Sequence, residues 1–346
     1  MIMDRIEIDQ KYISNDDPCY IIAEIGTGYR NFDEAKLLID SAKEIGIDAI
    51  KIQTFKADTI TSKNNFLDLE ETGHVSQYEL FKKLEISEEI QFKIVEYAKK
   101  IGITIFSAPS HMDDLNTMKK MNLPVNKIGS DLACHLPLLR EVGKQNKPVL
   151  VSTGMCTLDE IKKSVNTLKS TGNNQIVLLH CISDYPAKLE DSNLECIANF
   201  KKEFDVPVGF SDHSIGISIS LAAATLGANV IEKHFRDEKN TSSPDDVHAL
   251  TKIEFSELVK SIRNMEKMKG NGIKKPTKSE MENRLTSRVS IIAMMDIKKG
   301  TRITHEMVDI RRPGTGLPPE KLDQIIGKSV LHDIQKHQSL KSEDIE

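Results

Sequence analysis

The chain has 346 residues, of which 39% are hydrophobic and 29% charged, with 18 Gly and 12 Pro. This composition is that of a globular protein and excludes collagen-like and low-complexity chains, and the length suffices for one large and one small domain. The formal net charge of -5 excludes the broad basic surface of a nucleic-acid-binding protein. No apolar run reaches the roughly 20 residues that span a membrane, and the N-terminal residues, with Asp4, Arg5 and Glu7, lack the apolar stretch of a signal peptide. A cytoplasmic protein without a membrane partner is predicted.

The cysteines predict reduced thiols. Their number is odd, no two have Cys-x-x-Cys spacing, and most lie in apolar runs, so they fit neither a disulfide framework nor a zinc knuckle. They are Cys19, Cys134, Cys156, Cys181 and Cys196.

Short β-branched runs alternate with longer segments of helical period over most of the chain, which is typical of βα units and a parallel sheet. Strands are predicted at Tyr20–Ile25, Ala49–Thr54, Thr104–Ala108, Asn126–Ser130, Val149–Thr153, Ile176–Cys181, Val206–Ser211 and Val230–Phe235. Helices are predicted at Asp33–Glu44, Glu88–Lys100, Asp113–Met121, Leu136–Lys144, Leu158–Lys169, Leu194–Glu203, Ile217–Leu226 and Lys252–Lys269. Eight such units over about 250 residues predict an α/β protein with a (β/α)8 TIM barrel, whose reaction site lies at the carboxyl ends of the strands.

The pattern changes after Lys269. We assign residues 1–269 to the barrel, 270–286 to a linker of mixed charge, and 287–346 to a small C-terminal domain. A block of about 60 residues is near the limit of independent stability. Because its sequence shows no evident core, we expect it to pack against another surface.

Polar side chains follow the predicted strands where these end, and in a barrel such ends converge on one mouth. Lys51 and Lys127, with Ser130, Ser152 and neighbouring glycine amides, form a plausible pocket for a phosphate or a phosphorylated acid. The alternative is that the lysines extend to solvent or pair with acidic neighbours such as Glu24 and Asp131. Strand alternation places Lys51 with Gln53 and Glu232 with His234, and leaves open which face is the lumen.

His213 and His234 follow consecutive predicted strands and lie 21 residues apart in the sequence, the separation that one crossover with a helix requires. Adjacent strand ends bring two imidazoles within reach of one divalent cation. With carboxylate and substrate oxygens as further ligands, Mn²⁺ or a similar ion fits better than a structural zinc. For His180, inside an apolar run, a hydrogen-bonded wall position is at least as plausible as a ligand role.

Taken together, these segments resemble the sialic acid synthases, a family that includes the N-acetylneuraminate, legionaminate and pseudaminate synthases. The resemblance also extends to the C-terminal antifreeze-like (SAF, β-clip type) domain of that family. The segments that carry it are Ile22–Gly26, Lys51–Thr54, Tyr78–Leu84, Lys127–Ser130, Ser152–Met155, Leu179–Cys181, Tyr185-Pro186, Phe210–Ser214, Ile231–Phe235, Arg288, Lys299-Gly300, Arg312–Gly316 and Gly327-Lys328.

The resemblance implies a transferase that condenses phosphoenolpyruvate with an N-acylated hexosamine and releases phosphate by C–O cleavage. The sugar would be N-acetylmannosamine or a 2,4-diacetamido-2,4,6-trideoxyhexose, and the product a nonulosonic acid. It also implies a divalent metal, Mn²⁺ with Mg²⁺ or Co²⁺ as alternatives, on His213 and His234, and it makes Glu24 the catalytic acid/base beside these histidines. The positions implied for phosphoenolpyruvate are Lys51, Lys127, Ser130, Ser152 and Ser211, and those for the sugar are Gln53, Tyr185, Asp245 and Arg312.

In the resembled family the antifreeze-like domain of one subunit caps the barrel of the other, so the resemblance implies a domain-swapped homodimer in which Arg312 reaches the partner's sugar. Four loops depart from the family pattern, after the first, third, fourth and eighth predicted strands. Thr27–Arg30 replaces an Asn-His pair, and Ala108 stands where a threonine is common between Ser107 and Pro109. Asp131 directly follows Ser130 where the family often has an acid two residues on, and Asp246-Val247-His248 follows Asp245. These departures bear on the identity of the sugar.

Two other functions stay open at this point. One is a different phosphoenolpyruvate-dependent aldol enzyme, or a Schiff-base aldolase with Lys127 or Lys233 as the nucleophile, which would need a desolvated lysine. The other is a barrel without catalysis whose tail binds carbohydrate or protein.

Overall fold

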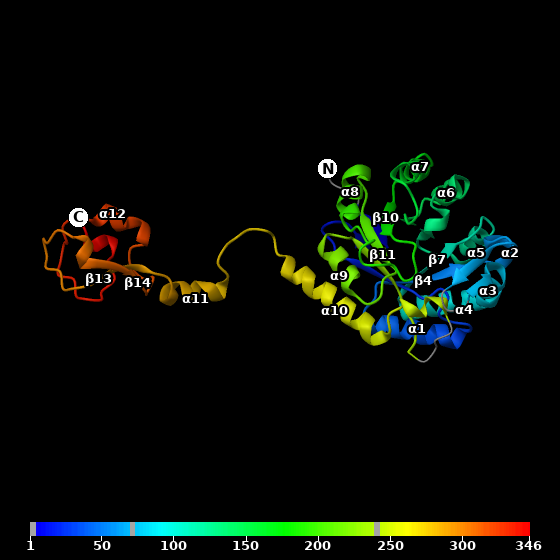
Figure 1. Cartoon of the computed structure of the whole chain (residues 1–346), viewed down its shortest axis with the longest axis horizontal. Coiled ribbons are helices and arrows are strands. Elements are labelled where there is room, and N and C mark those ends of the chain that lie inside the picture. The colour runs from blue at the N-terminus through cyan, green and yellow to red at the C-terminus, as the bar shows by residue number, and fades with distance from the viewer. Residues whose placement is uncertain (1–4, 70–72, 239–242) are drawn as a thin grey trace. The chain divides into compact units, whose positions relative to one another are not determined.

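The structure, a computed structural model, describes residues 5–69, 73–238 and 243–346 (Figure 1). The chain divides into two compact units, the first ending at Lys269 and the second beginning at Gly270. In the described ranges no helix combines the length and the apolar character needed to cross a membrane.

The first unit is a closed barrel of parallel strands. Going round it, the strands are β3 (Tyr20–Glu24), β4 (Ala49–Thr54), β7 (Thr104–Pro109), β8 (Asn126–Ile128), β9 (Val149–Ser152), β10 (Ile176–Cys181), β11 (Val208–Asp212) and β12 (Val230–His234). The predicted TIM barrel is therefore confirmed. Strand β12 pairs with β3 and closes the barrel, with His234 opposite Glu24, and Glu24 is opposite Lys51 of β4. This register places three predicted site residues side by side.

Helices cover the outside of the barrel (Figure 1). They are α1 (Phe32–Ile45), α4 (Glu88–Ile101), α5 (Asp114–Met121), α6 (Leu136–Gly143), α7 (Leu158–Lys169), α8 (Glu195–Phe204), α9 (Ser218–Thr225) and α10 (Lys252–Lys269). Local signals set their ends: Gly46 ends α1 in the left-handed conformation, and Thr157 begins α7 with a capping box to Glu160. These helices lie within two residues of the predicted ones.

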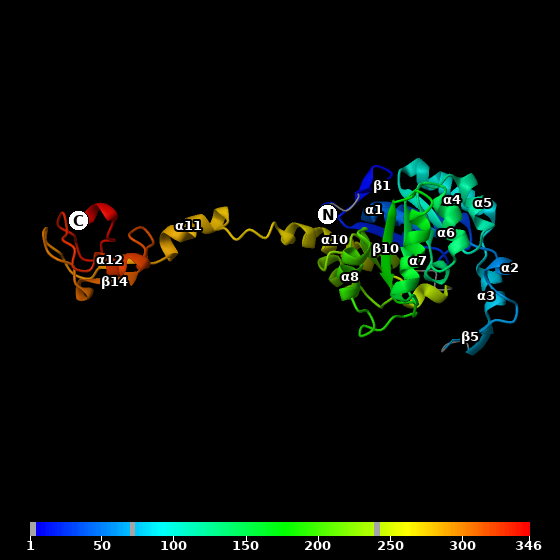
Figure 2. The ribbon, with the colours of Figure 1, turned by 90° about the horizontal axis from the view of Figure 1, so that it is seen from above.

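Short elements outside the βα alternation were not predicted. They are the hairpin of β1 (Ile6–Ile8) and β2 (Lys11–Ile13), the hairpin of β5 (Phe66–Leu69) and β6 (Gly73–Ser76), and the helices α2 (Ala57–Ile60) and α3 (Gln77–Leu84). Figure 2 shows β5 extending from the α2–α3 side of the barrel. Strands of three or four residues carry too little periodicity to be recognised from sequence.

The second unit contains α11 (Lys278–Ser287), β13 (Ser290–Ala293), β14 (Val308–Arg311) and α12 (Leu322–Ile325). The 3-10 turns of the chain are η1 (Ser130–Leu132), η2 (Pro244–Val247), η3 (His305–Met307), η4 (Pro319–Lys321) and η5 (Ser342–Asp344). Helix α11 falls in the segment predicted to be a linker. It begins with a capping box at Thr277 and buries no residue, so its sequence has no apolar stripe to reveal it.

The expectation that the C-terminal domain lacks a core of its own was wrong. Its buried apolar residues form one cluster: Ile291, Ala293, Ile297, Ile303, Val308, Ile325, Val330, Ile334, Leu340 and Ile345. Ile291, Ala293 and Val308 lie on the paired strands β13 and β14, whereas most of the others stand singly between turns and meet through isolated bridges such as Ile297 with Ile334. A core assembled by distant single residues leaves no periodic pattern in the sequence.

The C-terminal core makes a prediction about Ile291 and its cross-strand neighbour Ile310. Ile291 is fully buried, whereas Ile310 on the paired strand is 39% exposed. Truncating a buried isoleucine costs about 2–5 kcal/mol. Ile291→Ala is therefore expected to reduce the hydrogen-exchange protection of β13 and β14 strongly, with the barrel amides unchanged, while Ile310→Ala changes both little. Equal effects of the two substitutions would contradict this core.

Candidate active site

A buried cluster of two lysines and two glutamates lies at the carboxyl ends of the barrel strands. Lys51 Nζ is 2.7 Å from Glu24 Oε2 and 2.9 Å from Glu232 Oε1, and Lys127 Nζ is 3.6 Å from the same Glu232 oxygen. All four residues are buried. The lysines thus do not extend to solvent: Lys51 pairs with the predicted Glu24, and Lys127 pairs with Glu232 instead of Asp131.

Glu232 and Lys51 have shifted pKa values. Burial alone would raise the pKa of Glu232, but the charges and hydrogen bonds of Lys127, Lys51 and Ser211 lower it to about 2. Burial lowers the pKa of Lys51 to about 8, against the opposing effect of Glu232. Glu232 therefore stays ionised at neutral pH and holds two cations together in the lumen. Sequence analysis noted its position on the face of His234 but did not select it as a site residue.

The predicted serines lie around the two lysines. Lys127 donates to Ser152 Oγ at 2.7 Å, and the Ser211 hydroxyl donates to Glu232 Oε1 at 3.0 Å. Ser130 Oγ accepts from the Gly154 amide at 3.0 Å. A Cβ added at Gly154 would lie 2.2 Å from Ser183 Oγ and 2.9 Å from Ser130 Oγ, so a larger residue there would displace these two hydroxyls. Hydroxyls and amides thus line the pocket beside the ammonium groups.

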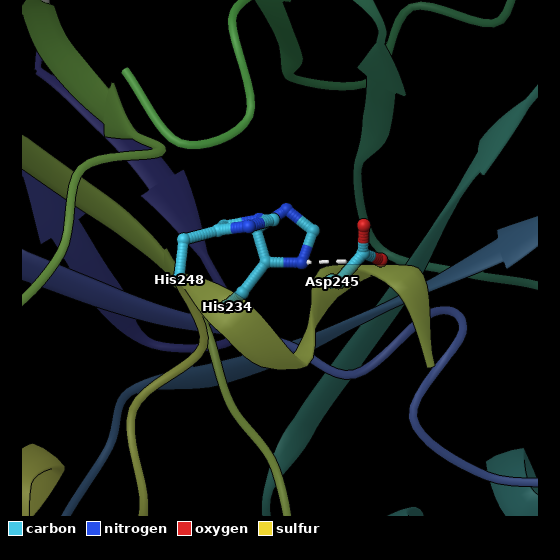
Figure 3. Close-up of side chains that lie close together, drawn as sticks. All are labelled: His234, Asp245 and His248. Carbon is cyan, nitrogen blue, oxygen red and sulfur yellow. Dashed lines mark ion pairs between the residues drawn. The ribbon is translucent and has the colours of Figure 1, made fainter. Parts of the chain in front are cut away.

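A second cluster contains histidines and one aspartate. His234, at the end of β12, has its Nδ1 3.4 Å from Asp245 Oδ2, and its ring centroid is 4.6 Å from that of His248 (Figure 3). Asp245 belongs to η2, and His248 follows directly after it. The Thr27 hydroxyl donates to Asp245, so the altered loop after β3 helps to hold this carboxylate.

His213, the other predicted ligand, lies beside this group. Its ring centroid is 5.5 Å from that of His234, and the Tyr185 ring packs against it at 4.3 Å. His213 Nδ1 is 2.7 Å from the Ile182 carbonyl oxygen, which can only accept, so Nδ1 carries the proton and Nε2 keeps its lone pair. Burial and the neighbouring His234 lower the pKa of His213 to about 4, which keeps the ring neutral at physiological pH.

His248 is the residue of this cluster that the sequence analysis missed as a ligand candidate. It is 1% exposed, and neither ring nitrogen has a hydrogen-bond partner among the described residues. Burial lowers its pKa to about 3. The sequence did contain a signal for this ligand candidate: the spacing Asp245-x-x-His248 follows a strand that ends in His234.

The donor set fits a divalent cation. One donor atom each from His234, Asp245 and His248 lies within 4.8 Å of the others. Imidazoles and carboxylates are common ligands of such ions, and a cation among these three side chains would give one of the two unpartnered His248 nitrogens a partner. His213, the other predicted ligand, is not one of these three residues; its ring centroid is 5.5 Å from that of His234.

Lys233 points the opposite way from Glu232 and His234. It is fully buried, its ammonium group is 3.1 Å from Asp212 Oδ2, and it also donates to the Ser214 carbonyl. Ser220 of α9 donates to the same Asp212 oxygen at 2.5 Å. Lys233 therefore faces the helical layer, and the lumen is the face of Glu232 and His234. A Schiff base on Lys233 would break this network, which leaves Lys127 as the lysine for that alternative.

The remaining predicted residues differ in their positions. Gln53 is half-buried, with Nε2 3.4 Å from Glu24 Oε1. His180 donates through Nε2 to the Ser192 carbonyl at 2.9 Å and packs edge-on against Phe200 and Phe210, as a wall residue does. Arg312 lies in the second unit, where it is exposed.

Fold and site together define a TIM-barrel protein with a lysine–carboxylate pocket beside a histidine cluster. A profile of the NeuB family matches residues 38–274, and a SAF domain profile matches residues 288–346. The N,N'-diacetyllegionaminic acid synthase of Legionella pneumophila is 36% identical over 95% of each chain. An uncharacterised protein of Methanocaldococcus jannaschii is 39% identical over 99% of each chain.

Solved structures agree with these matches. The N-acetylneuraminic acid synthetase of Leptospira borgpetersenii superposes with a TM-score of 0.73 at 29% identity, covering 82% of this chain and 95% of that one. The Bacillus subtilis spore coat polysaccharide biosynthesis protein spsE superposes with a TM-score of 0.69 at 31% identity over 99% of both chains. The chain belongs to the NeuB family, and its C-terminal part is a SAF domain, as the sequence resemblance predicted.

The shared carboxylate makes a prediction about stability. Glu232→Gln removes the carboxylate paired with Lys127 and leaves Lys51 with Glu24 as its remaining ion-pair partner. Removing one partner of a buried pair costs about 3–5 kcal/mol. Denaturant unfolding of the barrel at pH 7 should show this loss. In the variant the pKa of Lys51 in the folded state falls further below its unfolded value of 10.5. A lysine with a lowered folded pKa adds stability as the pH rises through that pKa, so the rise begins at a lower pH in the variant than in the native chain. The deficit should therefore shrink at pH 9.

The control is Glu89→Gln, which removes an exposed carboxylate paired with Lys93 at 2.7 Å. Exposed pairs contribute about 0–1 kcal/mol, so this variant should unfold close to the native chain at both pH values. A deficit of Glu232→Gln that grows from pH 7 to pH 9 would contradict the arrangement described.

Proposed function

We propose that this protein condenses phosphoenolpyruvate with an N-acylated hexosamine to form a nonulosonic acid and phosphate. The observation that carries the proposal is the buried pocket of Lys51, Lys127 and Glu232 directly beside the histidine cluster. Relatives support it, because chains 36–38% identical are named N,N'-diacetyllegionaminic acid synthases, and one at 35% is named a pseudaminic acid synthase. We therefore infer a 2,4-diacetamido-2,4,6-trideoxyhexose as the first sugar to test, with N-acetylmannosamine as the alternative.

Phosphoenolpyruvate carries a carboxylate and a phosphate, and the pocket offers groups suited to both. The ammonium groups of Lys51 and Lys127 would bind the anion, and the hydroxyls of Ser130, Ser152 and Ser211 would complete its hydrogen bonds. Glu232 keeps the two lysines close without ligand. In this assignment the pocket orients the enol carbon towards the sugar aldehyde.

Glu24 is assigned to proton transfer. Its carboxylate is buried beside Lys51, and its strand position is opposite His234. The new bond joins C3 of phosphoenolpyruvate to the aldehyde carbon, water adds at C2, and the C–O bond to phosphate then breaks. Glu24 would take the proton of that water or supply one to the sugar oxygen.

A divalent ion fits the residues His213, His234, Asp245 and His248, and when bound it would polarise the aldehyde oxygen as a Lewis acid. The family resemblance implies Mn²⁺, with Mg²⁺ and Co²⁺ as alternatives, and all three ions are to be tested for activity. Tyr185, 54% exposed and packed on His213, and half-buried Gln53 would line the sugar side. Asp245 would contact both the metal ion and the sugar.

The test of this function is phosphate release from phosphoenolpyruvate in the presence of each candidate sugar. Release is expected only with both substrates, with loss of activity after chelator treatment and return on adding a divalent ion. Borohydride with pyruvate should leave no adduct on Lys127. Turnover that resists chelator, together with a borohydride adduct, would favour the Schiff-base alternative, and no release with any of the sugars would contradict the proposal.

We also propose a domain-swapped homodimer in which Arg312 serves the sugar site of the partner subunit. A planar guanidinium suits the acyl group, and the SAF domain would exclude water from the mouth. Inactive Arg312→Ala chains mixed with inactive His213→Ala chains should regain part of the activity, because one site of a mixed dimer has both residues intact. Failure to regain activity despite demonstrated subunit exchange would rule out action in trans.

A further inference from the structure

We propose that His248 is a direct metal ligand that makes this centre rich in nitrogen, so that the enzyme prefers ions such as Co²⁺ over Mn²⁺. The inference rests on the proposed function, because it refines the metal of the same site. His248 lies in the loop after β12, three residues after Asp245. It does not belong to the predicted ligand pair of His213 and His234.

The first support is position. The His248 ring centroid is 4.6 Å from that of His234 and 5.9 Å from that of His213. One of its ring nitrogens lies within 4.8 Å of a ring nitrogen of His234 and of a carboxylate oxygen of Asp245. In Figure 3 the His234 ring lies between the Asp245 carboxylate and the His248 ring. The three side chains thus bring their donor atoms to one place.

The second support is the state of the His248 ring. It is almost completely buried, and both nitrogens are without a hydrogen-bond partner among the described residues. Native structures rarely leave buried polar atoms unsatisfied, and each such atom calls for a physical explanation. A bound cation supplies one for a single nitrogen, because the nitrogen of a neutral imidazole that has a free lone pair is a metal ligand, while the other nitrogen carries the proton.

The third support is the way the loop is held. Leu250 donates its amide to the His234 carbonyl at 2.9 Å and forms a parallel bridge with Phe235, so the chain returns to the end of β12. At the other end of the loop, Ser243 and Asp246 form a capping box, and Thr27 holds Asp245. His248 is therefore placed between two anchored points. Such fixed placement is what a ligand position requires.

The choice of ion follows from the donor types. Oxygen-rich sites suit Mg²⁺ and Mn²⁺, whereas imidazole suits later ions, and the affinity of a given site rises from Mn²⁺ to Co²⁺. With His213 and His234 alone, two nitrogens share the ion with oxygens. A third imidazole strengthens binding of Co²⁺ more than that of Mn²⁺. His248 thus sets the ratio of the two affinities.

The test compares the native chain with His248→Leu, which keeps an apolar side chain in the buried space, and with His305→Leu as control. His305 lies exposed in η3 of the C-terminal unit, so its loss removes one imidazole far along the chain from the cluster. Metal-free full-length protein is titrated with Co²⁺, followed by its visible absorption, and with Mn²⁺, followed by calorimetry. Phosphate release is measured separately for each loaded protein.

His248→Leu is expected to weaken Co²⁺ binding by at least about tenfold, since even partners outside the ligand shell contribute 10–100-fold in metal sites. Mn²⁺ binding should weaken less, so the ratio of the two affinities falls, and the Co²⁺ absorption should change shape. His305→Leu should match the native chain. Equal losses for both ions, or an unchanged Co²⁺ affinity, would overturn the inference even if phosphate release continues.

Thermal unfolding separates a ligand from a core residue. A histidine that only packs in the core would lower the melting temperature of the metal-free protein when replaced. We expect metal-free His248→Leu to melt no lower than the native chain, because the substitution removes unsatisfied nitrogens, and we expect the rise in melting temperature on adding Co²⁺ to shrink. A lower metal-free melting temperature with an undiminished Co²⁺ effect would overturn the proposal. A native chain that binds neither ion but still releases phosphate would overturn the ligand role of His248. The proposed condensation reaction would not be contradicted by that result.

Discussion

One carboxylate organises the interior of this barrel mouth. Glu232 accepts Lys51 and Ser211 on the same oxygen and lies within ion-pair distance of Lys127, so residues from three strands other than its own converge on it. Two ammonium groups in a dry lumen would repel each other and lose hydration, and neither is stable there without a counter-charge. The cost of burying them is offset by Glu232 and by the Lys51–Glu24 pair. This network holds the two ammonium groups in the barrel mouth.

The same strands carry a second network on their outer face. Lys233 and Asp212 pair between the barrel and α9, and each is the sequence neighbour of a histidine in the mouth. Because successive side chains of a strand alternate, an anchored outer residue fixes the direction of the inner ones. The inner and outer ion pairs thus hold β11 and β12 from both sides. The histidine cluster then depends on the loop from Ser243 to Leu250, which returns to the end of β12.

The NeuB family relationship gives these groups a common chemistry. A pocket with two lysines suits an anion, a histidine and aspartate cluster suits a divalent ion, and Glu24 stands between them in the register of β3, β4 and β12. Two of the loops predicted to depart from the family pattern follow β3 and β12. These two loops meet where Thr27 donates to Asp245. A substitution in the loop after β3 is therefore expected to affect the positions of residues in the loop after β12, including His248.

The sequence by itself determined the barrel, because buried parallel strands and amphipathic helices leave periodic patterns, and their carboxyl ends pointed to Glu24, Lys51, Lys127, His213 and His234. It also identified the family through short segments in a specific order. Only the tertiary structure decided that Glu232 joins the two lysines, that Lys233 faces away from the lumen, and that His248 meets His234. The core of the C-terminal domain was likewise invisible beforehand. In each case the contact joins single residues from separate strands and loops, and such pairings have no local periodicity that a sequence could display.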